Sequence, residues 1–275
     1  MSRRRLDLLL VRRGLAPTRS KAQELIASGS VFARGFPQYK AATQVDDDCP
    51  IIIRTAEKQW VSRGAHKLIQ GLDVFAVNPQ GKNCLDVGAS TGGFTEVLLE
   101  RGARKVWAVD VGYGQLAWQI REDDRVHVME RTNARHLTPQ DLGATMDLIV
   151  SDASFISLKL LLPALQELGH PDADWVLLVK PQFEAGRERV GEGVIHDRVL
   201  HKAILAELAS FIADGTSLAL VGTTFSPIQG PKGNIEFLFH LRQKRNKTSI
   251  VALDQTVDAA HAYFQERAAL KGESP

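Results

Sequence analysis

From about residue 63 onward, short apolar runs of strand length alternate with stretches that have a helical period. This alternation predicts a largely parallel sheet with helices on both faces, because a parallel strand returns to its sheet through a crossover helix. No convincing helix separates the last two runs, so we expect an antiparallel edge there. The predicted fold class is α/β, with a seven-stranded, mostly parallel sheet built from these runs: Cys84–Val87, Val106–Val109, Val126–Met129, Leu148–Val150, Trp175–Val179, Leu218–Val221 and Ile235–Leu241.

The first 54 residues contain shorter elements. Leu6, Leu9 and Leu10 fall on one helical face, and a second helix over Arg19–Ala27 should stop at Gly29. Short strands are expected at residues 31–33 and 50–54.

These patterns divide the chain into four parts. We expect a small α+β domain over residues 1–54, a linker over 55–62 and the α/β domain over 63–245. The C-terminal tail, residues 246–275, should contain an amphipathic helix over residues 253–271.

Positive charge is concentrated at the N-terminus. Residues 1–45 carry nine basic and two acidic side chains, which gives +7, whereas the whole chain has a net charge of +2 and the remainder therefore −5. Such a block is typical of a module that binds phosphates, although a solvated charged face is an equally simple interpretation.

Cysteine content and hydropathy limit the class of protein. The two cysteines, Cys49 and Cys84, have no metal-ligand spacing, so we expect neither a metal site nor a disulfide scaffold. No apolar run approaches the roughly 20 residues of a membrane span, and the run after Arg5 is too short for a secretory signal. We therefore expect a cytoplasmic protein without a membrane partner.

A glycine-rich turn follows the first predicted strand, at residues 85–94 (LDVGASTGGF). Small residues there allow a ligand to approach the backbone, and Asp110 ends the next strand, where a carboxylate can accept hydrogen bonds from ribose hydroxyls. A dinucleotide site would need glycine at Ser90. The turn also matches the G-x-S-x-G elbow of hydrolases, but no histidine is well placed to serve it. A third interpretation, which we favour, is an S-adenosylmethionine site.

Four charged residues are notable for their positions. Lys67 precedes the α/β domain's first strand, Asp152 and Lys180 follow apolar strands, and Glu236 lies within an apolar run. The carboxyl ends of parallel strands form the binding crevice of an open α/β sheet, so Asp152 and Lys180 should share one cleft. A buried glutamate is costly unless it is paired. Each residue alone could simply form a salt bridge, but the set of two lysines and two carboxylates is more specific.

The C-terminal domain resembles the FtsJ-type ribose 2′-O-methyltransferases, whose Lys-Asp-Lys-Glu tetrad matches Lys67, Asp152, Lys180 and Glu236. The N-terminal stretch resembles the alpha-L RNA-binding domain, and the order of the two domains is similar to that of the TlyA family. The junction at residues 61–68 (VSRGAHKL) has Ala65 where the family usually has glycine, which leaves Lys67 in register. The resemblance covers about residues 3–241 and rests on further segments at residues 5–7, 14–16, 20–22, 26–31, 110–116 (DVGYGQL), 151–157 (SDASFIS) and 178–184 (LVKPQFE).

The resemblance implies a Rossmann-like class I methyltransferase domain. It also implies S-adenosylmethionine as cofactor and 2′-O-methylation of cytidine in small- and large-subunit ribosomal RNA. The expected cofactor-binding residues are Asp86, Gly88, Ser90, Gly92, Gly93, Phe94, Asp110, Asn133 and Asp152, with Asn133 near the adenine. The expected RNA contacts in the N-terminal domain are Arg3, Arg4, Arg5, Arg19, Lys21 and Arg34.

The chemistry of ribose methylation suggests roles for the four charged residues. A ribose hydroxyl is a poor nucleophile while it is protonated, and a desolvated lysine beside a second lysine has a lowered pKa, so it can act as a base. Lys180 ends a strand at the centre of the predicted sheet. We expect it to be more desolvated than Lys67 and therefore closest to base catalysis. Lys67 would orient the ribose or a phosphate, while Asp152 and Glu236 hold the lysines.

Two other functions are possible for a chain of this kind. The TlyA family also carries a haemolysin label, but only the helix at 253–271 could act on a membrane, and it holds both acidic and basic residues. An RNA-binding ribosome assembly factor without catalysis is the other alternative, and the intact tetrad argues against it. Residues 183–195 lack any helical or strand period and carry three glycines, so we predict a mobile loop over the active site, with a disordered surface loop that has no role in the site as the alternative.

Overall fold

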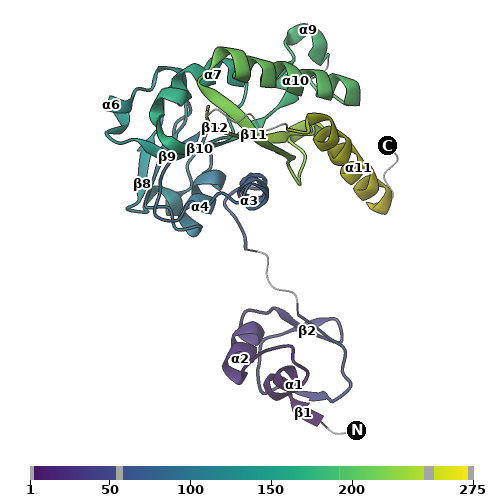
Figure 1. The fold of residues 1–275 in the computed structure, drawn as a ribbon. Coiled ribbons are helices and arrows are strands. Elements are labelled where there is room, and N and C mark those ends of the chain that lie inside the picture. Colours follow the sequence, from purple (N-terminus) through teal and green to yellow (C-terminus); the bar gives the residue numbers. More distant parts are fainter. Residues whose placement is uncertain (1–2, 54–57, 192, 245–250, 272–275) are drawn as a thin grey trace. The chain divides into compact units, whose positions relative to one another are not determined.

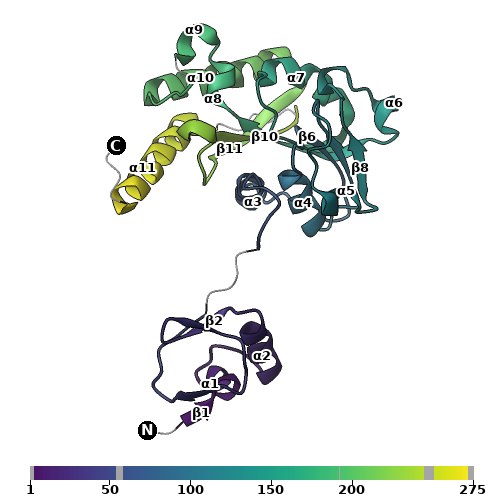
Figure 2. The ribbon, with the colours of Figure 1, turned by 180° about the vertical axis from the view of Figure 1, so that it is seen from behind.

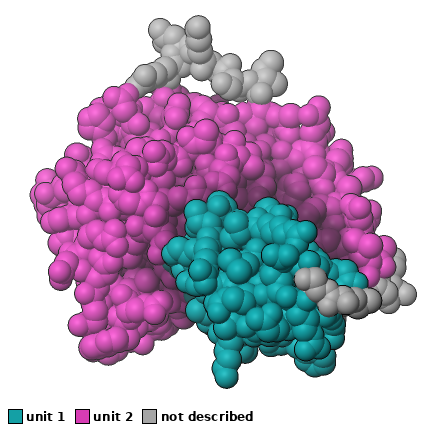
Figure 3. Space-filling view, turned by 90° about the horizontal axis from the view of Figure 1, so that it is seen from below, with its two compact units in different colours: residues 1–59 teal, residues 60–275 magenta. Residues whose placement is uncertain are grey.

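The computed structural model describes residues 3–53, 58–191, 193–244 and 251–271. It forms two compact units, residues 1–59 and 60–275, which have different colours in Figure 3. The predicted linker at 55–62 lies partly outside the described residues. Its last residues pack in the second unit, where Trp60 and Val61 contact the core and the Val61 N–H donates to the Glu96 carboxylate at 2.8 Å.

Unit 1 is a small α+β domain. Thr18 caps α2 by accepting a hydrogen bond from the Lys21 N–H, and Gly29 follows the helix at a φ of 72°. Strand β1 pairs antiparallel with β4, and β2 lies between β3 and β5. The elements are β1 (Arg3–Arg5), α1 (Leu6–Arg12), α2 (Arg19–Ala27), β2 (Val31–Ala33), β3 (Phe36–Gln38), β4 (Gln44–Asp46) and β5 (Ile51–Ile53).

Unit 2 contains a seven-stranded sheet in the order β11-β12-β10-β9-β6-β7-β8. The neighbours from β10 to β8 are parallel, and β12 is antiparallel to both β10 and β11, so the predicted α/β fold with an antiparallel edge is confirmed. The strands are β6 (Asn83–Val87), β7 (Lys105–Val109), β8 (Val126–Met129), β9 (Met146–Ser151), β10 (Gly169–Val179), β11 (Leu218–Phe225) and β12 (Phe237–Gln243).

Helices cover both faces of this sheet. Figures 1 and 2 show α7 and α10 on one side and α3 and α4 on the other. Adjacent strand residues point to opposite faces, so Leu177 packs with α7 and α10 while its neighbour Val176 packs with α3 and α4. The helices are α3 (Ala65–Val74), α4 (Gly93–Glu100), α5 (Trp118–Arg121), α6 (Pro139–Leu142), α7 (Leu158–Leu165), α8 (Pro181–Glu184), α9 (Arg187–Val190), α10 (Arg198–Gly215) and α11 (Leu253–Lys271).

The C-terminal helix α11 contacts α10 and the edge strand β11. One side of α11 buries Val257 and Ala260 in the main core, where Leu253 and Phe264 also pack. The helix therefore uses its apolar side for packing within unit 2. In the part of the chain that the structure describes, no helix is both long and apolar enough to cross a membrane.

Two expectations about local structure were wrong. Residues 183–195 are not without regular structure, because α8 and α9 form single helical turns there and Ala185 and Ile195 pack against Ile204 of α10. Glu236 does not lie within a strand but directly before β12, which begins at Phe237. One-turn helices have no detectable period in a sequence, which explains the first error.

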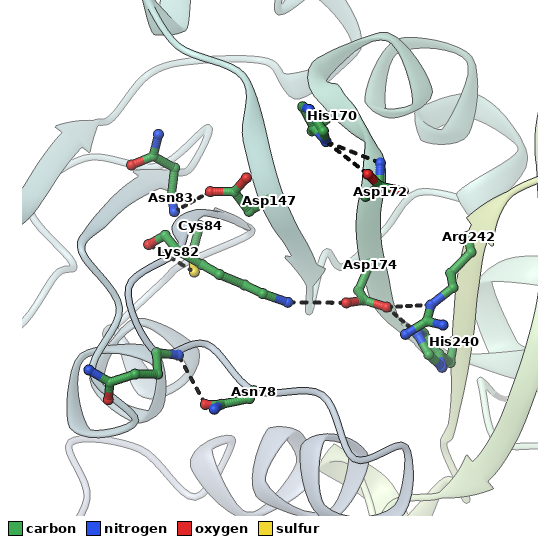
Figure 4. A network of polar contacts seen from close by, with 11 residues as sticks. Asn78, Lys82, Asn83, Cys84, Asp147, His170, Asp172, Asp174, His240 and Arg242 are labelled. Atoms are coloured by element: carbon green, nitrogen blue, oxygen red, sulfur yellow. Dashed lines mark hydrogen bonds and ion pairs between the residues drawn. The ribbon is translucent and has the colours of Figure 1, made fainter.

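A buried network joins three strands near the amino end of β6 (Figure 4). The Asp174 carboxylate on β10 accepts hydrogen bonds from Lys82 at 3.2 Å, His240 at 2.8 Å and Arg242 at 2.7 Å. Burial by itself would raise the pKa of Asp174, but these three donors hold it well below its usual range. The network ties β10 and β12 to the start of β6, at the end of β6 opposite the glycine-rich turn.

Candidate active site

A cavity of about 360 Å³ opens where β6, β7 and β9 end. This is the edge of an open α/β sheet where ligands bind. Five of the predicted cofactor residues line it: Gly88, Ser90, Asp110, Asn133 and Asp152. The lining also includes Val111, Gly112, Gln115, Thr132 and residues 153–156.

Gly88 brings the turn after β6 against the loop after β9. Its φ is 85°, and a Cβ at this position would lie 2.8 Å from the Ala153 Cα. Any other residue would therefore force the two loops apart. The Asp152 N–H also donates to the Val87 carbonyl at 3.0 Å, so the turn and the loop form one wall.

Asp110 joins two other segments of the wall. Its carboxylate accepts hydrogen bonds from the Ser90 N–H at 2.8 Å and from the Gly112 N–H at 2.7 Å. A carboxylate has about four acceptor positions, so it can still accept from the hydroxyls of a ligand.

The other four predicted cofactor residues are not among the residues that line this cavity. Asp86 is fully buried and accepts a hydrogen bond from the Thr95 hydroxyl at 2.6 Å, and burial raises its pKa to about 7. Phe94 is buried in the core, and Gly93 faces Ser62 and Ala65. A Cβ on Gly92 would meet Leu116 at 3.0 Å and Ile120 at 3.2 Å. Asp86, Gly92, Gly93 and Phe94 therefore pack behind the turn that forms the cavity wall, and a direct contact of these residues with the cofactor stays a prediction.

The hydrolase interpretation of the same turn lacks a base. Ser90 has a positive φ of 49°, as a strained elbow would, but its hydroxyl donates to the Gln115 side chain at 3.3 Å. The residues that line the cavity include no histidine.

The four charged residues come together from four separate segments. Lys67 lies on α3, Asp152 follows β9, Lys180 follows β10, and Glu236 precedes β12. The Lys180 Nζ is 2.6 Å from Asp152 Oδ1, and the Lys67 Nζ is 2.6 Å from Glu236 Oε2 and 3.6 Å from Asp152 Oδ2. Asp152 lies between the two ammonium groups and also borders the cavity.

Glu236 is fully buried beneath a tight turn. A Cβ on Gly230 would lie 2.3 Å from Glu236 Oε1, so glycine is needed for the chain to pass over the carboxylate. Burial raises the pKa of Glu236, although the charge of Lys67 opposes this. Such a carboxylate holds Lys67 in a single position.

Burial does not distinguish the two lysines, contrary to our expectation. Their side chains are equally exposed, at 8% each. Their contacts do differ, because the Lys180 Nζ also donates to the Ser154 hydroxyl at 2.6 Å and to the Asp152 carbonyl at 3.1 Å. Lys180 is therefore bonded to two residues of the cavity wall, whereas Lys67 reaches the wall only through the longer contact to Asp152.

Ser154 and Phe155 are site residues that the sequence patterns did not single out. Phe155 is 89% exposed at the cavity, has a φ of 63°, and its ring lies 5.2 Å from that of Phe183. A bulky residue in the left-handed region is strained and is usually maintained by its surroundings for a purpose. The family-like segment at residues 151–157 contains both residues and could have identified them.

The predicted RNA-binding residues of unit 1 are paired with carboxylates, which the charge count over residues 1–45 did not indicate. All six form ion pairs with carboxylates: Arg3 and Arg34 with Asp46, Arg4 with Asp47, Arg5 and Arg19 with buried Asp7, and Lys21 with Glu24. The count over residues 1–45 left out Asp46, Asp47 and Asp48. Residues 1–59 carry eleven basic and six acidic side chains, which gives +5 rather than +7. The unit is still basic, and an arginine has five donors, so pairing leaves some of them available.

Comparison with known proteins agrees with this architecture. Residues 60–243 match the FtsJ-like methyltransferase family, and residues 4–32 match the S4 domain. A Mycobacterium tuberculosis protein named 16S/23S rRNA (cytidine-2′-O)-methyltransferase TlyA is 50% identical over 269 residues, which are 97% of this chain and 99% of that protein.

Other similar proteins have a different name. Hemolysin A of Brachyspira hyodysenteriae is 41% identical over 86% of this chain and 98% of its own length. A solved structure of a candidate hemolysin from Streptococcus thermophilus is 39% identical, with a TM-score of 0.75, and covers 98% of this chain and 99% of its own. Because identity and coverage are high along both units, the chain belongs to the TlyA family, in which an S4 domain precedes an FtsJ-like methyltransferase domain.

Proposed function

We propose that the protein transfers a methyl group from S-adenosylmethionine to the 2′-hydroxyl of cytidine in ribosomal RNA. The observation that carries the proposal is the pairing of Lys180 and Lys67 around Asp152 at the edge of the cavity. The activity named for the Mycobacterium tuberculosis relative is of this kind. Ribosomal RNA as substrate would make the cytoplasm the place of action.

The cavity fits the proposed cofactor in its chemistry. Asp110 offers acceptors for ribose hydroxyls, and Asn133 and Gly88 lie in the same cavity wall. When bound, S-adenosylmethionine supplies a methyl group that its positive sulfonium has already activated. We assign Asp110 to the ribose and Asn133 to the adenine side, with Gly88, Ser90 and Asp152 towards the reacting end.

The residues of the site would then position and deprotonate the substrate hydroxyl. We assign Lys180 to taking the proton of the 2′-hydroxyl, because its Nζ is bonded to the cavity residues Asp152 and Ser154. Lys67, held by Glu236, would orient the ribose or an adjacent phosphate. The remaining catalysis is in-line placement of the hydroxyl.

Phe155 offers a surface for the base of the target nucleotide. Its exposed ring borders the cavity and is supported from one side by Phe183. Stacking of a base on an aromatic ring contributes about 1–3 kcal/mol and is a usual way to hold an unpaired nucleotide. Unit 1 would supply affinity for the rest of the RNA through its net positive charge.

Tritium transfer from labelled cofactor to ribosomal RNA tests the proposal. We expect label in RNA, and after alkaline hydrolysis it should remain in alkali-resistant dinucleotides, because a 2′-O-methyl group blocks cleavage of the next phosphodiester. RNA binding without any transfer would instead favour the assembly-factor function. Release of dye from lipid vesicles at similar protein concentrations would favour the membrane-active function.

A further inference from the structure

Glu184 is a buried carboxylate that has no place in the chemistry described above. It ends α8, four residues after Lys180, and only 8% of the residue is exposed. Its Oε2 accepts a hydrogen bond from the Ser157 hydroxyl at 2.6 Å, and its Oε1 accepts one from the Leu158 N–H at 2.7 Å. Both donors lie at the start of α7, at the far end of the loop that begins with Asp152.

The start of α7 has two caps, one from its own chain and one from α8. The Ser157 hydroxyl accepts a hydrogen bond from the Lys159 N–H, as a local cap does. The Glu184 carboxylate adds acceptors for Leu158 and Ser157 and places negative charge at the positive end of the helix. The local cap from Ser157 is enough to begin a helix. The second cap, from Glu184, also ties the start of α7 to the segment after β10.

Three contacts connect the loop at residues 152–157 to the segment at residues 180–184. At the first end of the loop, the Lys180 ammonium binds Asp152 and Ser154. In the middle, the Phe155 ring lies against Phe183. At the last end, Glu184 binds Ser157. Both ends of the loop are therefore held by one short segment.

The loop needs this support because its conformation is strained. Phe155 has a φ of 63°, a strained conformation for a bulky residue that persists only when neighbouring structure maintains it. Release of the loop at Ser157 would allow Phe155 to relax and would change the position of Ser154 relative to the Lys180 Nζ.

We infer that Glu184 is a positioning residue. It holds the loop of Asp152, Ser154 and Phe155 at a fixed position relative to the Lys180 side chain. The inference rests on the proposed methyl transfer for its functional consequence. Glu184 does not border the cavity, so it acts through Ser157 and Leu158 and not on a substrate.

The test compares single-turnover methyl transfer by full-length wild type, Glu184→Gln and Glu184→Ala at saturating cofactor and RNA. Glutamine keeps one acceptor, and alanine keeps none. We expect the rate to fall in that order, with a loss of up to about 100-fold for alanine, the effect of a misplacement of about 1 Å. The rate should change more than the KM for RNA. The matched control is Glu207→Gln, which removes an exposed carboxylate that pairs with Arg189, and it should leave the rate unchanged.

A double-mutant cycle with Ser157→Ala shows whether Glu184 acts through that hydroxyl. The rate losses of Glu184→Ala and Ser157→Ala should not add, because each removes the hydrogen bond between these two side chains. Additive losses would contradict the inference, as would rates within twofold of wild type for both Glu184 variants. If Glu184→Ala does not fold, the single-turnover rate of Glu184→Gln alone tests the inference.

Hydrogen exchange provides a measurement that does not depend on catalysis. In the protein without ligands, the Leu158 amide should exchange faster in Glu184→Ala than in wild type, and residues 152–157 should lose protection with it. Unchanged exchange there would contradict the inference. An inactive wild type with the expected exchange pattern would contradict the proposed function and leave the positioning role standing.

Discussion

Lys180 is the side chain on which the proposed chemistry depends most. Lys180→Ala should lower single-turnover methylation by about 10²–10⁴-fold, the usual loss for a positioned base. Cofactor affinity should change little, because Lys180 is not among the residues that line the cavity. Lys180→Arg should not restore the rate, since arginine keeps its proton. Near wild-type transfer by Lys180→Arg would contradict the base role. Lys202→Ala, on the surface of α10, is the control.

Asp86 should make the protein less stable as the pH rises, whereas a carboxylate in an ion pair makes a protein more stable as the pH rises. Burial raises its pKa from 3.8 to about 7, so the folded state binds a proton that the unfolded state has released between these values. Stability from this group is complete below about pH 3.8 and is lost as the pH rises through 7. Between pH 4 and 7, Asp86→Asn should remove this loss, of up to roughly 4 kcal/mol. Urea unfolding at several pH values measures it, with exposed Asp73→Asn as control. An unchanged pH slope in Asp86→Asn would disprove the linkage.

At the level of single residues, the sequence indicated Asp152, Lys180 and Glu236 because each adjoins or lies within an apolar run, and Lys67 because it precedes the first strand of the α/β domain. It did not predict that Lys67 and Lys180 are equally buried, because burial depends on the helices that cover them. The pairing of Arg4 with Asp47 was also not predictable, since the two residues are 43 positions apart and meet only through the fold. The full burial of Asp86 was not predictable either, because strand and turn residues have no sharp boundary in the sequence.

Among the elements, the apolar strands were predictable, including the short strands β2 and β5, whereas β1 and β3 were not. Strands β6, β7, β9 and β10 bury mostly apolar runs, a pattern with few alternatives between helical stretches. By contrast, β1 consists of three arginines and β3 contains a proline, so neither resembles a strand. They form because the strands next to them supply hydrogen-bond partners.

The Asp174 network should contribute stability that disappears in acid. Asp174→Asn removes charged hydrogen bonds to Lys82, His240 and Arg242 and should cost about 1–3 kcal/mol at pH 7. The folded-state pKa of Asp174 is lowered, so its contribution is present above about pH 3.8 and declines as the pH falls towards the folded value. Urea unfolding at pH 7 and pH 3 should show a smaller difference between variant and wild type in acid. An equal difference at both pH values would contradict this account.

Across the whole molecule, we expect chemistry and most of the RNA affinity to belong to different units. A fragment of residues 60–275 should keep cofactor affinity and lose most RNA affinity, together with part of the salt dependence, because unit 1 carries the net positive charge. The fragment must begin at Trp60 and not at Arg63, because Trp60 and Val61 pack in the core of unit 2. Calorimetry and filter binding at two salt concentrations provide the comparison. Equal RNA affinity and an equal salt slope would show that unit 1 is not the RNA-binding part.

The proposed site, with two lysines paired around Asp152, would direct methyl transfer to the ribose of cytidine in ribosomal RNA. Nucleoside mass spectrometry tests this directly on ribosomal RNA from cells that lack the protein, complemented with wild type or with Lys180→Ala. We expect 2′-O-methylcytidine to appear with wild type and to be absent with Lys180→Ala. A methyl group on the base, or the same amount of 2′-O-methylcytidine with and without the protein, would contradict it.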